Sequence, residues 1–219
     1  MMAKRSEYTH PNLQFELELW EQGLRQVVGI DEAGRGALAG PVVVGAVCFP
    51  ADLRLATPLH GVRDSKQLTP TERAYWAERI KAFALAWAVG FASNEEIDRL
   101  GIAKATRLAA QRALQGLLCR PQHLLIDYFR LPECALPQTA LVKGDQRCLS
   151  IAAASILAKT ERDRWMMAVD EKYPHYGFAA HKGYATALHL ERIERWGACP
   201  IHRRSFAPLR SPIENKESV

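Results

Sequence analysis

Short runs of apolar residues, each bounded by glycine, proline or polar residues, mark the candidate strands of this chain. Five runs have the length and apolar content of buried strands: residues 25–30, 41–49, 85–92, 123–127 and 139–142. The glycine-rich segment 33–40 joins the first two runs. A connection this short suits a hairpin, so we expect the first two strands to pair in antiparallel fashion.

Helix signals lie between and after these runs. Thr69 can cap a helix, Pro70 fits its first position and Glu72 can complete a capping box, so a helix is expected to about Phe83. The other expected helices are 94–118 with a break near Gly101, 149 to about 173 ended by Pro174, and 181–196 ended by Gly197. Strands that come first and helices that cover them later predict a mixed α/β layer architecture.

The chain shows no internal repeat and no low-complexity linker, so its 219 residues are expected to form a single domain. We expect a core over about residues 25–170, a helical C-terminal extension over about 171–210 and a frayed polar tail at 211–219. Hydrophobic residues make up 48% of the chain, which is enough to bury a sizeable core.

Charge adds a weak indication of partner. Lys and Arg number 29 against 24 Asp and Glu, which gives a formal net charge of +5. This excess favours a polyanionic partner, although a solvated basic surface explains it equally well.

Cysteine usage and the N-terminus indicate a cytoplasmic protein. The five cysteines include no CxxC pair, and an odd number argues against a disulfide framework. The Cys199-Pro-Ile-His202 segment could form half of a metal site, but the sequence offers no second half. Residues 1–10 lack the apolar stretch of a secretory signal, and no run of about 18 apolar residues could span a membrane.

A glycine loop follows the first strand and admits two interpretations. Residues 34–39 match the G-x-G-x-x-G/A pattern of dinucleotide-binding proteins, but a strand follows where that motif requires a helix. We therefore reject a nicotinamide site. Glycines also let backbone amides approach a ligand, and Arg35 between them can contact phosphate. A plain tight turn remains the alternative.

Acidic residues stand at the ends of two expected strands and in the long helix. Asp31 and Glu32 follow the first strand, Asp127 ends the fourth, and Asp163 lies one helical turn after Lys159. Acids at strand ends are costly unless they are paired or bind a metal, and oxygen ligands suit Mg²⁺ or Mn²⁺. Each acid taken alone could equally be a cap, a surface residue or half of an ion pair.

Several segments in order resemble ribonuclease HII. The match begins with the first strand and glycine loop and continues over roughly residues 27–208. The matching segments are Gly29-Ile-Asp-Glu-Ala-Gly-Arg-Gly36, Gly40-Pro-Val-Val43, Asp64-Ser-Lys-Gln-Leu68, Leu125-Ile-Asp127, Lys143-Gly-Asp145, Ser150-Ile-Ala-Ala-Ala-Ser-Ile-Leu-Ala-Lys159, Arg162-Asp163, His181-Lys-Gly-Tyr184 and His202-Arg-Arg-Ser-Phe206.

The resemblance implies a ribonuclease H-like fold, in which a mixed five-stranded sheet is flanked by helices and followed by a helical C-terminal part. It implies four catalytic acids that bind two Mg²⁺ or Mn²⁺ ions: Asp31, Glu32, Asp127 and Asp163. It further implies a set of substrate-binding residues: Gly34, Arg35, Gly36, Tyr184, Lys66, Lys143, Ser150 and Lys182. One departure stands out, because Tyr128 follows the third acid where many members of the family have glycine.

The activity implied is hydrolysis of the RNA strand of RNA–DNA hybrids and nicking 5′ of ribonucleotides embedded in duplex DNA, leaving 5′-phosphate ends. The substrates would be RNA–DNA hybrid and DNA containing ribonucleotides, in DNA replication and repair. We expect a monomer, no membrane contact, and at most a clamp contact through the C-terminal tail. Three rivals are a non-catalytic hybrid-binding module, a phosphatase of small phosphoesters and the disfavoured nicotinamide enzyme.

Overall fold

The computed structural model describes residues 10–210, so the predicted frayed tail 211–219 lies outside the described residues. A five-stranded sheet in the order β3-β2-β1-β4-β5 forms its centre. The strands are β1 (Val27–Ala33), β2 (Val42–Cys48), β3 (Ala86–Ala92), β4 (His123–Asp127) and β5 (Gln138–Leu141). The pairs β1–β2 and β2–β3 are antiparallel, whereas β1–β4 and β4–β5 are parallel. The predicted mixed sheet and its antiparallel first pair are confirmed.

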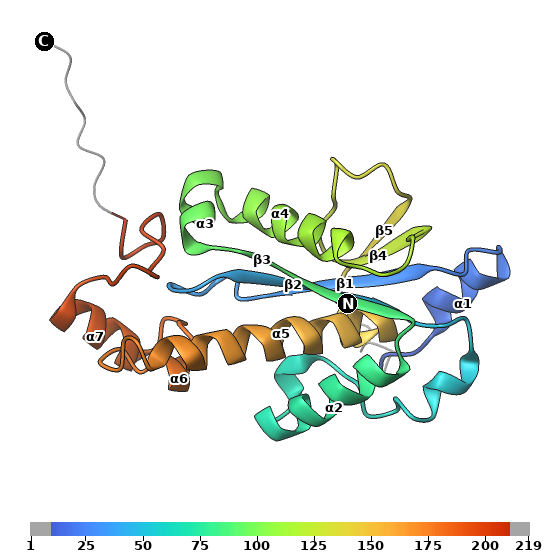
Figure 1. Cartoon of the computed structure of the whole chain (residues 1–219), viewed down its shortest axis with the longest axis horizontal. Coiled ribbons are helices and arrows are strands. Elements are labelled where there is room, and N and C mark those ends of the chain that lie inside the picture. Colours follow the sequence, from blue (N-terminus) through green and yellow to red (C-terminus); the bar gives the residue numbers. More distant parts are fainter. Residues whose placement is uncertain (1–9, 211–219) are drawn as a thin grey trace, which may run out of the picture.

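Helices cover both faces of the sheet (Figure 1). One face carries α5 (Leu149–Asp170) and, beside it, α2 (Pro70–Phe83), while the other carries α3 (Asn94–Leu100) and α4 (Ile102–Gln115). The capping box of α2 forms as predicted, and the expected break separates α3 from α4. Two buried clusters of apolar residues, one on each face, hold these three layers together.

Two strand glycines bring α5 directly onto the sheet. A Cβ atom at Gly29 would stand 2.2 Å from the carbonyl carbon of Ser150, and one at Gly45 would stand 2.3 Å from the carbonyl oxygen of Ala154. Any side chain at either position would push the helix away. The close approach fixes α5 against β1 and β2, and it therefore fixes the helix relative to the acids of β1.

The ends of the chain differ from the sequence prediction. Helix α1 (Gln14–Glu21) was not expected, and it buries Trp20 and Glu16. The helix predicted over 181–196 is wrong: α6 (Phe178–His181) and α7 (Ala187–Trp196) are separate helices. Lys182 and Gly183 have φ of +52° and +80°, which no α-helix tolerates, and Thr186 then caps α7.

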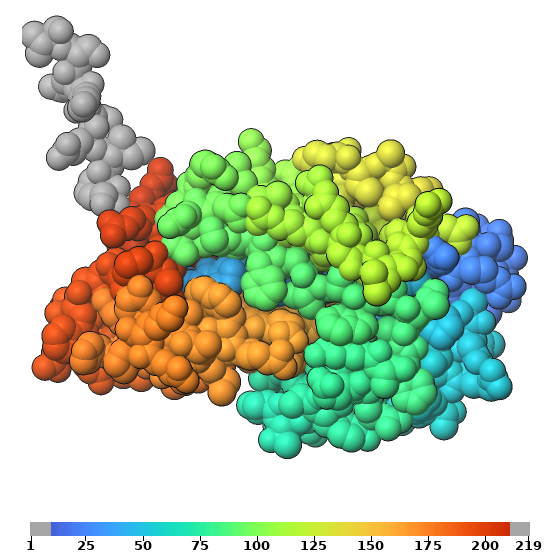
Figure 2. Space-filling view, viewed as in Figure 1, coloured from blue at the N-terminus to red at the C-terminus, as the bar shows by residue number. Residues whose placement is uncertain are grey.

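The whole molecule is elongated, with α1 at one end and α6 and α7 at the other (Figures 1 and 2). Within residues 10–210, none of the helices combines the length and the hydrophobicity that a membrane span requires.

Candidate metal and nucleic-acid site

Three carboxylates converge at one edge of the sheet. Oxygen atoms of Asp31, Asp127 and Asp145 all lie within 4.8 Å of one another. Asp31 and Asp145 are buried and Asp127 is half-buried. Acids packed this closely repel one another unless a cation stands between them, so the cluster has the character of a metal site.

Strand pairing explains why Asp31 and Asp127 meet. The parallel register sets Ile30 beside Ile126, so the residue after each lies at the same edge of the sheet. Ile30 and Ile126 point into the core on the α4 side. Side chains alternate between faces along a strand, so Asp31 and Asp127 both point to the α5 side.

Asp145 reaches the cluster through the strand beside Asp127. Because β5 runs parallel to β4, the chain that leaves β5 emerges at the edge where Asp127 lies. Lys143 then turns the backbone with a φ of +55°, and the Gly144 N–H donates to Asp127 Oδ1 at 2.7 Å. This bond holds the 3₁₀ turn Gly144–Gln146, and with it Asp145, against Asp127.

Enclosure and mutual repulsion raise the pKa values of the three acids. Burial raises the pKa of Asp31 well above its ordinary value, and the charges of Glu32 and Asp127 raise it further. Burial, followed by the charges of Asp64 and Asp127, raises the pKa of Asp145 to about 6. Burial is also the largest cause of the raised pKa of Asp127. A divalent cation would stabilise all three carboxylates in their charged form.

Lys66 is the cation that the fold itself places near the acids. Its surroundings include four carboxylates whose charges outweigh the effect of burial and raise the pKa of Lys66: Asp64, Asp145, Asp31 and Asp127. The Asp64 side chain accepts the Lys66 backbone N–H at 3.0 Å. The hydroxyl oxygens of Ser65 and Ser155 lie 3.0 Å apart and tie the segment to α5. Lys66 therefore lies beside the acid cluster, and its contact with a substrate stays a prediction.

Glu32 leaves β1 on the opposite face from Asp31, because adjacent strand residues alternate. One oxygen, Oε1, pairs with Arg35 at 3.4 Å, while the buried Oε2 has no hydrogen-bond partner among residues 10–210. Burial raises the pKa of Glu32, and Arg35 opposes the change. A buried carboxylate oxygen without a donor, beside three other acids, fits a ligand for a cation.

The structure does not bring Asp163 into this cluster. Asp163 pairs with Lys159 at 2.6 Å and with Arg73 at 3.2 Å. It lies eight residues after Ser155, which hydrogen-bonds Asp31, and that spacing along a helix is about 12 Å. The sequence prediction that Asp163 joins Asp31, Glu32 and Asp127 is therefore corrected, and Asp145 takes its place. The signal missed was that Lys143-Gly144-Asp145 follows a parallel strand beside Asp127.

Two buried arginines hold the glycine loop, and the sequence reasoning did not single them out. Arg203 donates to the carbonyl oxygens of Gly34, Arg35, Gly40 and Pro41 at 2.7–3.0 Å. Arg162 donates to the carbonyl oxygens of Ala39, Pro41 and Lys182 at 2.9–3.0 Å. Both side chains are fully buried. Their hydrogen bonds to backbone carbonyls at both ends of the loop hold the loop in one shape.

The two glycines of the loop differ in what requires them. Gly34 has a φ of +90°, and a Cβ there would stand 1.9 Å from Arg162 Nε. Gly36 is exposed, and a Cβ there would meet nothing within 4 Å. The fold therefore demands glycine at position 34 but not at 36, where only an external ligand would need the open backbone.

The remaining predicted substrate residues have different surroundings. Tyr184 is half-buried on the turn before α7, with the charged groups of Lys159 and Arg162 5.6 Å and 5.3 Å from its ring centre. Lys143 is exposed, and the Lys182 ammonium donates to the Ala179 carbonyl oxygen. Ser150 is a correction. It is fully buried at the start of α5, and its N–H donates to Glu16 Oε1 at 2.8 Å, so it cannot touch a substrate.

The chain is similar to known proteins over nearly its whole length. The family model described as Ribonuclease HII matches residues 28–209. A ribonuclease HII of Myxococcus xanthus is 54% identical over 202 residues, which are 92% of this chain and 68% of that protein. One of Dehalococcoides mccartyi is 52% identical over 199 residues, or 91% of this chain and 94% of that protein.

Two solved structures share the fold. Ribonuclease H2 from Pyrococcus horikoshii matches with a TM-score of 0.68 and 29% identity, over 84% of this chain and 95% of that one. The PCNA:RNase HII complex from Archaeoglobus fulgidus matches with a TM-score of 0.70 and 28% identity, over 85% of this chain and 97% of that one. The ribonuclease H-like fold predicted from the sequence is confirmed.

Proposed function

The chain belongs to the ribonuclease HII family, and from this premise we propose that it cuts RNA–DNA hybrids with the help of divalent cations and nicks duplex DNA 5′ of embedded ribonucleotides. Its membership makes it a ribonuclease H, an endoribonuclease. The observation that carries the proposal is the convergence of Asp31, Asp127 and Asp145 beside the glycine loop.

The donor set fits hard cations. Three clustered carboxylates and the unpartnered Oε2 of Glu32 supply only oxygen atoms, which suit Mg²⁺ or Mn²⁺. We propose that Asp31, Glu32, Asp127 and Asp145 hold two such ions. When bound, the ions would activate the attacking water and stabilise the leaving oxygen of the phosphodiester. Asp163 instead orients Lys159 and Arg73 on the neighbouring surface.

The chain's own groups would bind and orient the substrate. Gly36 presents an open backbone that a ribose 2′-hydroxyl can approach, and buried Arg203 holds the loop in place for it. Tyr184, between two cationic groups, offers its ring to the sugar of the next nucleotide. Lys66, Lys143 and Lys182 would meet backbone phosphates, so binding should weaken as salt rises.

We also propose that the chain is a monomer with a single domain. It would act in the cytoplasm, during DNA replication and repair. The Archaeoglobus fulgidus relative is described in complex with PCNA. A comparable clamp contact here would use the C-terminal tail, which lies outside the described residues.

Duplex DNA with one ribonucleotide, incubated with Mg²⁺, with Mn²⁺ or with chelator, tests this function. The expected result is a single nick 5′ of the ribonucleotide that requires a divalent cation and is lost in Asp31→Asn. All-DNA duplex of the same sequence is the control for specificity. Cutting of long hybrid but not of this duplex would reject the junction-reading role of the loop, and tight hybrid binding without turnover would favour the binding module.

A further inference from the structure

A basic groove borders the acid cluster on the side of the sheet that faces α4. It has a volume of about 330 Å³, and Arg35, Arg107 and Arg130 line it together with Phe129 and Thr106. No acid lines it. Since Glu32 leaves β1 on this same face and pairs with Arg35, the groove starts where the acid cluster ends.

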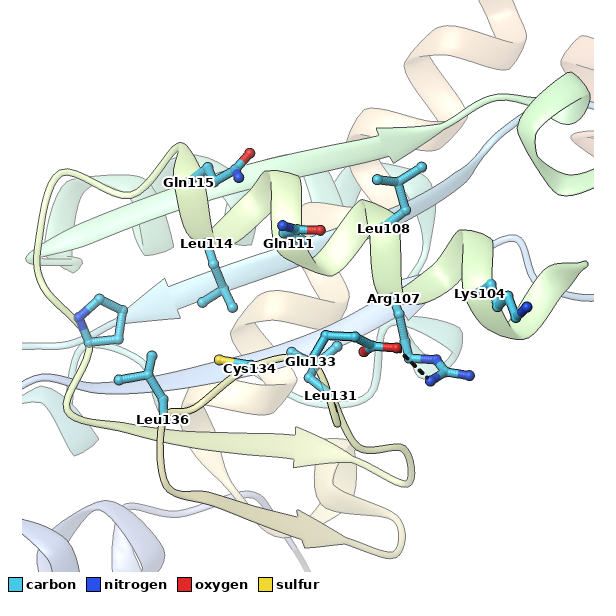
Figure 3. Close-up of a pocket in the computed structure, with 11 residues that line it drawn as sticks. Lys104, Arg107, Leu108, Gln111, Leu114, Gln115, Leu131, Glu133, Cys134 and Leu136 are labelled. Atoms are coloured by element: carbon cyan, nitrogen blue, oxygen red, sulfur yellow. Dashed lines mark hydrogen bonds and ion pairs between the residues drawn. The ribbon is translucent and has the colours of Figure 1, made fainter. Parts of the chain in front are cut away.

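The three arginines are held to different degrees. Arg35 pairs with half-buried Glu32, and Arg107 pairs with exposed Glu133 at 3.0 Å (Figure 3). No hydrogen bond or ion pair within residues 10–210 holds Arg130, which is exposed. The three arginines therefore carry more positive charge than their two partners, Glu32 and Glu133, neutralise. Lys104, one turn before Arg107 on the same side of α4, extends this charge (Figure 3).

The apolar hollow that lies next to the groove does not have this character. It has a volume of about 450 Å³ between α4 and segment 131–136, and leucine side chains form much of its wall. Arg107 of α4 lines both hollows, and its partner Glu133 lines the apolar one. In Figure 2 the yellow-green atoms of α4 lie beside the yellow segment that follows β4 at the surface of the molecule.

We propose that the groove of Arg35, Arg107 and Arg130 binds a backbone phosphate of the nucleic-acid substrate other than the phosphate of the bond that is cut. This proposal rests on the proposed function, because the acid cluster must hold the reacting phosphate for the groove to receive another. Planar guanidinium groups bind phosphate through paired N–H donors, and three of them around one hollow exclude a purely apolar ligand. Such a contact adds affinity without reading base sequence.

Binding of a labelled RNA–DNA hybrid in chelator, at several salt concentrations, tests the groove. Arg130→Gln and Arg107→Gln should each weaken binding severalfold and reduce the slope of log K against log salt by up to about 0.9, the value for loss of one whole phosphate contact. Steady-state cleavage with divalent cation should show KM raised by more than kcat is lowered.

Glu133→Gln should change hybrid affinity in the opposite direction, because it leaves both arginines in place. Removing the acid that neutralises Arg107 should tighten hybrid binding at low salt, and this effect should disappear at high salt. Arg54→Gln is the matched control, because Arg54 is exposed, pairs only locally with Asp52 and lies outside the groove. It should change neither the slope nor the affinity.

The outcomes separate the two proposals. If the unaltered protein neither binds nor cuts hybrid, the proposed function fails. If it cuts hybrid while Arg130→Gln and Arg107→Gln keep its salt slope and Glu133→Gln keeps its affinity, the groove proposal is overturned and the proposed function stands. The groove proposal would also be overturned if Arg130→Gln and Arg107→Gln lost no more affinity than Arg54→Gln, since such a loss would reflect net charge alone.

Discussion

Asp145 and Asp163 are both aspartates, but their surroundings give them different chemistry. Asp145 is buried against Asp127, whereas Asp163 is neutralised by Lys159 and Arg73. We predict that Asp145→Asn lowers kcat on hybrid by more than about 10²-fold, the scale on which losing one electrostatic stabiliser acts. Single-turnover cleavage at saturating Mg²⁺ or Mn²⁺ measures this loss.

Asp163→Asn is the matched control for this prediction. It changes the same atoms, but it removes a partner of two cations rather than a ligand, so we expect cleavage to fall much less than in Asp145→Asn. Isothermal titration of Mn²⁺ should show weakened binding only in the Asp145 variant. Equal losses of metal affinity in both variants would contradict the assignment made here.

Tyr128 carries backbone strain at the rim of the site. Its φ is +65°, a region that favours glycine, and Phe129 N–H donates to the Asp127 carbonyl oxygen at 2.7 Å across a three-residue turn. The residue is 72% exposed, so removing its side chain uncovers little core. We predict that Tyr128→Gly raises the free energy of unfolding by about 1 kcal/mol through relief of strain, measured by urea denaturation.

Tyr128→Ala separates strain from the loss of the ring. Alanine keeps the unfavourable φ, so this variant should gain none of the stability that glycine gains. If both variants destabilise the protein equally, the ring itself contributes to the fold and the prediction is wrong.

The position of a single residue could be predicted only where the local sequence determines it. The strand-end positions of Asp31 and Asp127 follow from apolar patterning, so their meeting could be predicted. Asp163 was misplaced because helical spacing gives the partners along one helix, here Lys159, but not the distance from that helix to a strand end. Ser150 was misplaced because nothing local reveals that Glu16, from an unpredicted helix, covers it.

The glycine loop is the element whose shape depends most on distant residues. Arg203 lies far along the chain, yet its four hydrogen bonds satisfy loop carbonyls at both ends of the loop. Lysine has one donor group in place of a planar fork, so it cannot reach all four oxygens. We predict that Arg203→Lys lowers preference for a ribonucleotide over a deoxynucleotide at the junction more than it lowers hybrid affinity.

Cleavage of the duplex with one ribonucleotide, compared with the all-DNA duplex, measures that preference, and binding of long hybrid measures the affinity. Arg204→Lys is the control, since this neighbour is exposed and contacts Asp98 through its backbone N–H. A purely structural role for Arg203 would lower both activities together and lower the melting temperature to match. Unchanged discrimination in a folded Arg203→Lys variant would remove the loop from junction reading.

Elements were predicted best where local chemistry is decisive. The capping box at Thr69 and the glycine break at Gly101 both appear where the sequence placed them. The prediction of one continuous C-terminal helix was wrong because Lys182 adopts a left-handed conformation, which lysine as a residue type does not predict. The Arg162 N–H donated to the Lys182 carbonyl oxygen helps to hold that turn, and this contact is tertiary.

At the scale of the molecule, the α/β layers could be predicted, because burial of five apolar runs requires a sheet covered on both faces. The attachment of the C-terminal part could not. It depends on a buried network that joins residues from three segments: His181, His189, Cys199 and His202. The half metal site suspected in Cys199-Pro-Ile-His202 is part of this network, in which the Cys199 N–H donates to His202 Nδ1 at 2.9 Å.

The network requires neutral histidines. Since His202 Nδ1 accepts the Cys199 N–H, its Nε2–H donates to His189 Nε2 at 3.1 Å, and His189 Nδ1–H then donates to the Tyr184 carbonyl oxygen. A further proton on His189 would set two N–H groups against each other. Burial is the largest cause that lowers the pKa of both His189 and His202 to about 4, from an ordinary 6.5.

Stability should therefore fall as pH falls from about 6.5 to about 4, because over this range the unfolded chain binds protons that the folded protein excludes. Each such histidine adds a slope of up to about 1.4 kcal/mol per pH unit. His202→Gln should reduce that slope even if it lowers stability at pH 7.5, whereas His175→Gln, at an exposed position outside the network, should not. Urea denaturation at a series of pH values gives both slopes. Identical slopes for the unaltered protein and His202→Gln would show that the network is not what makes stability depend on pH, and another set of buried groups would have to account for that dependence.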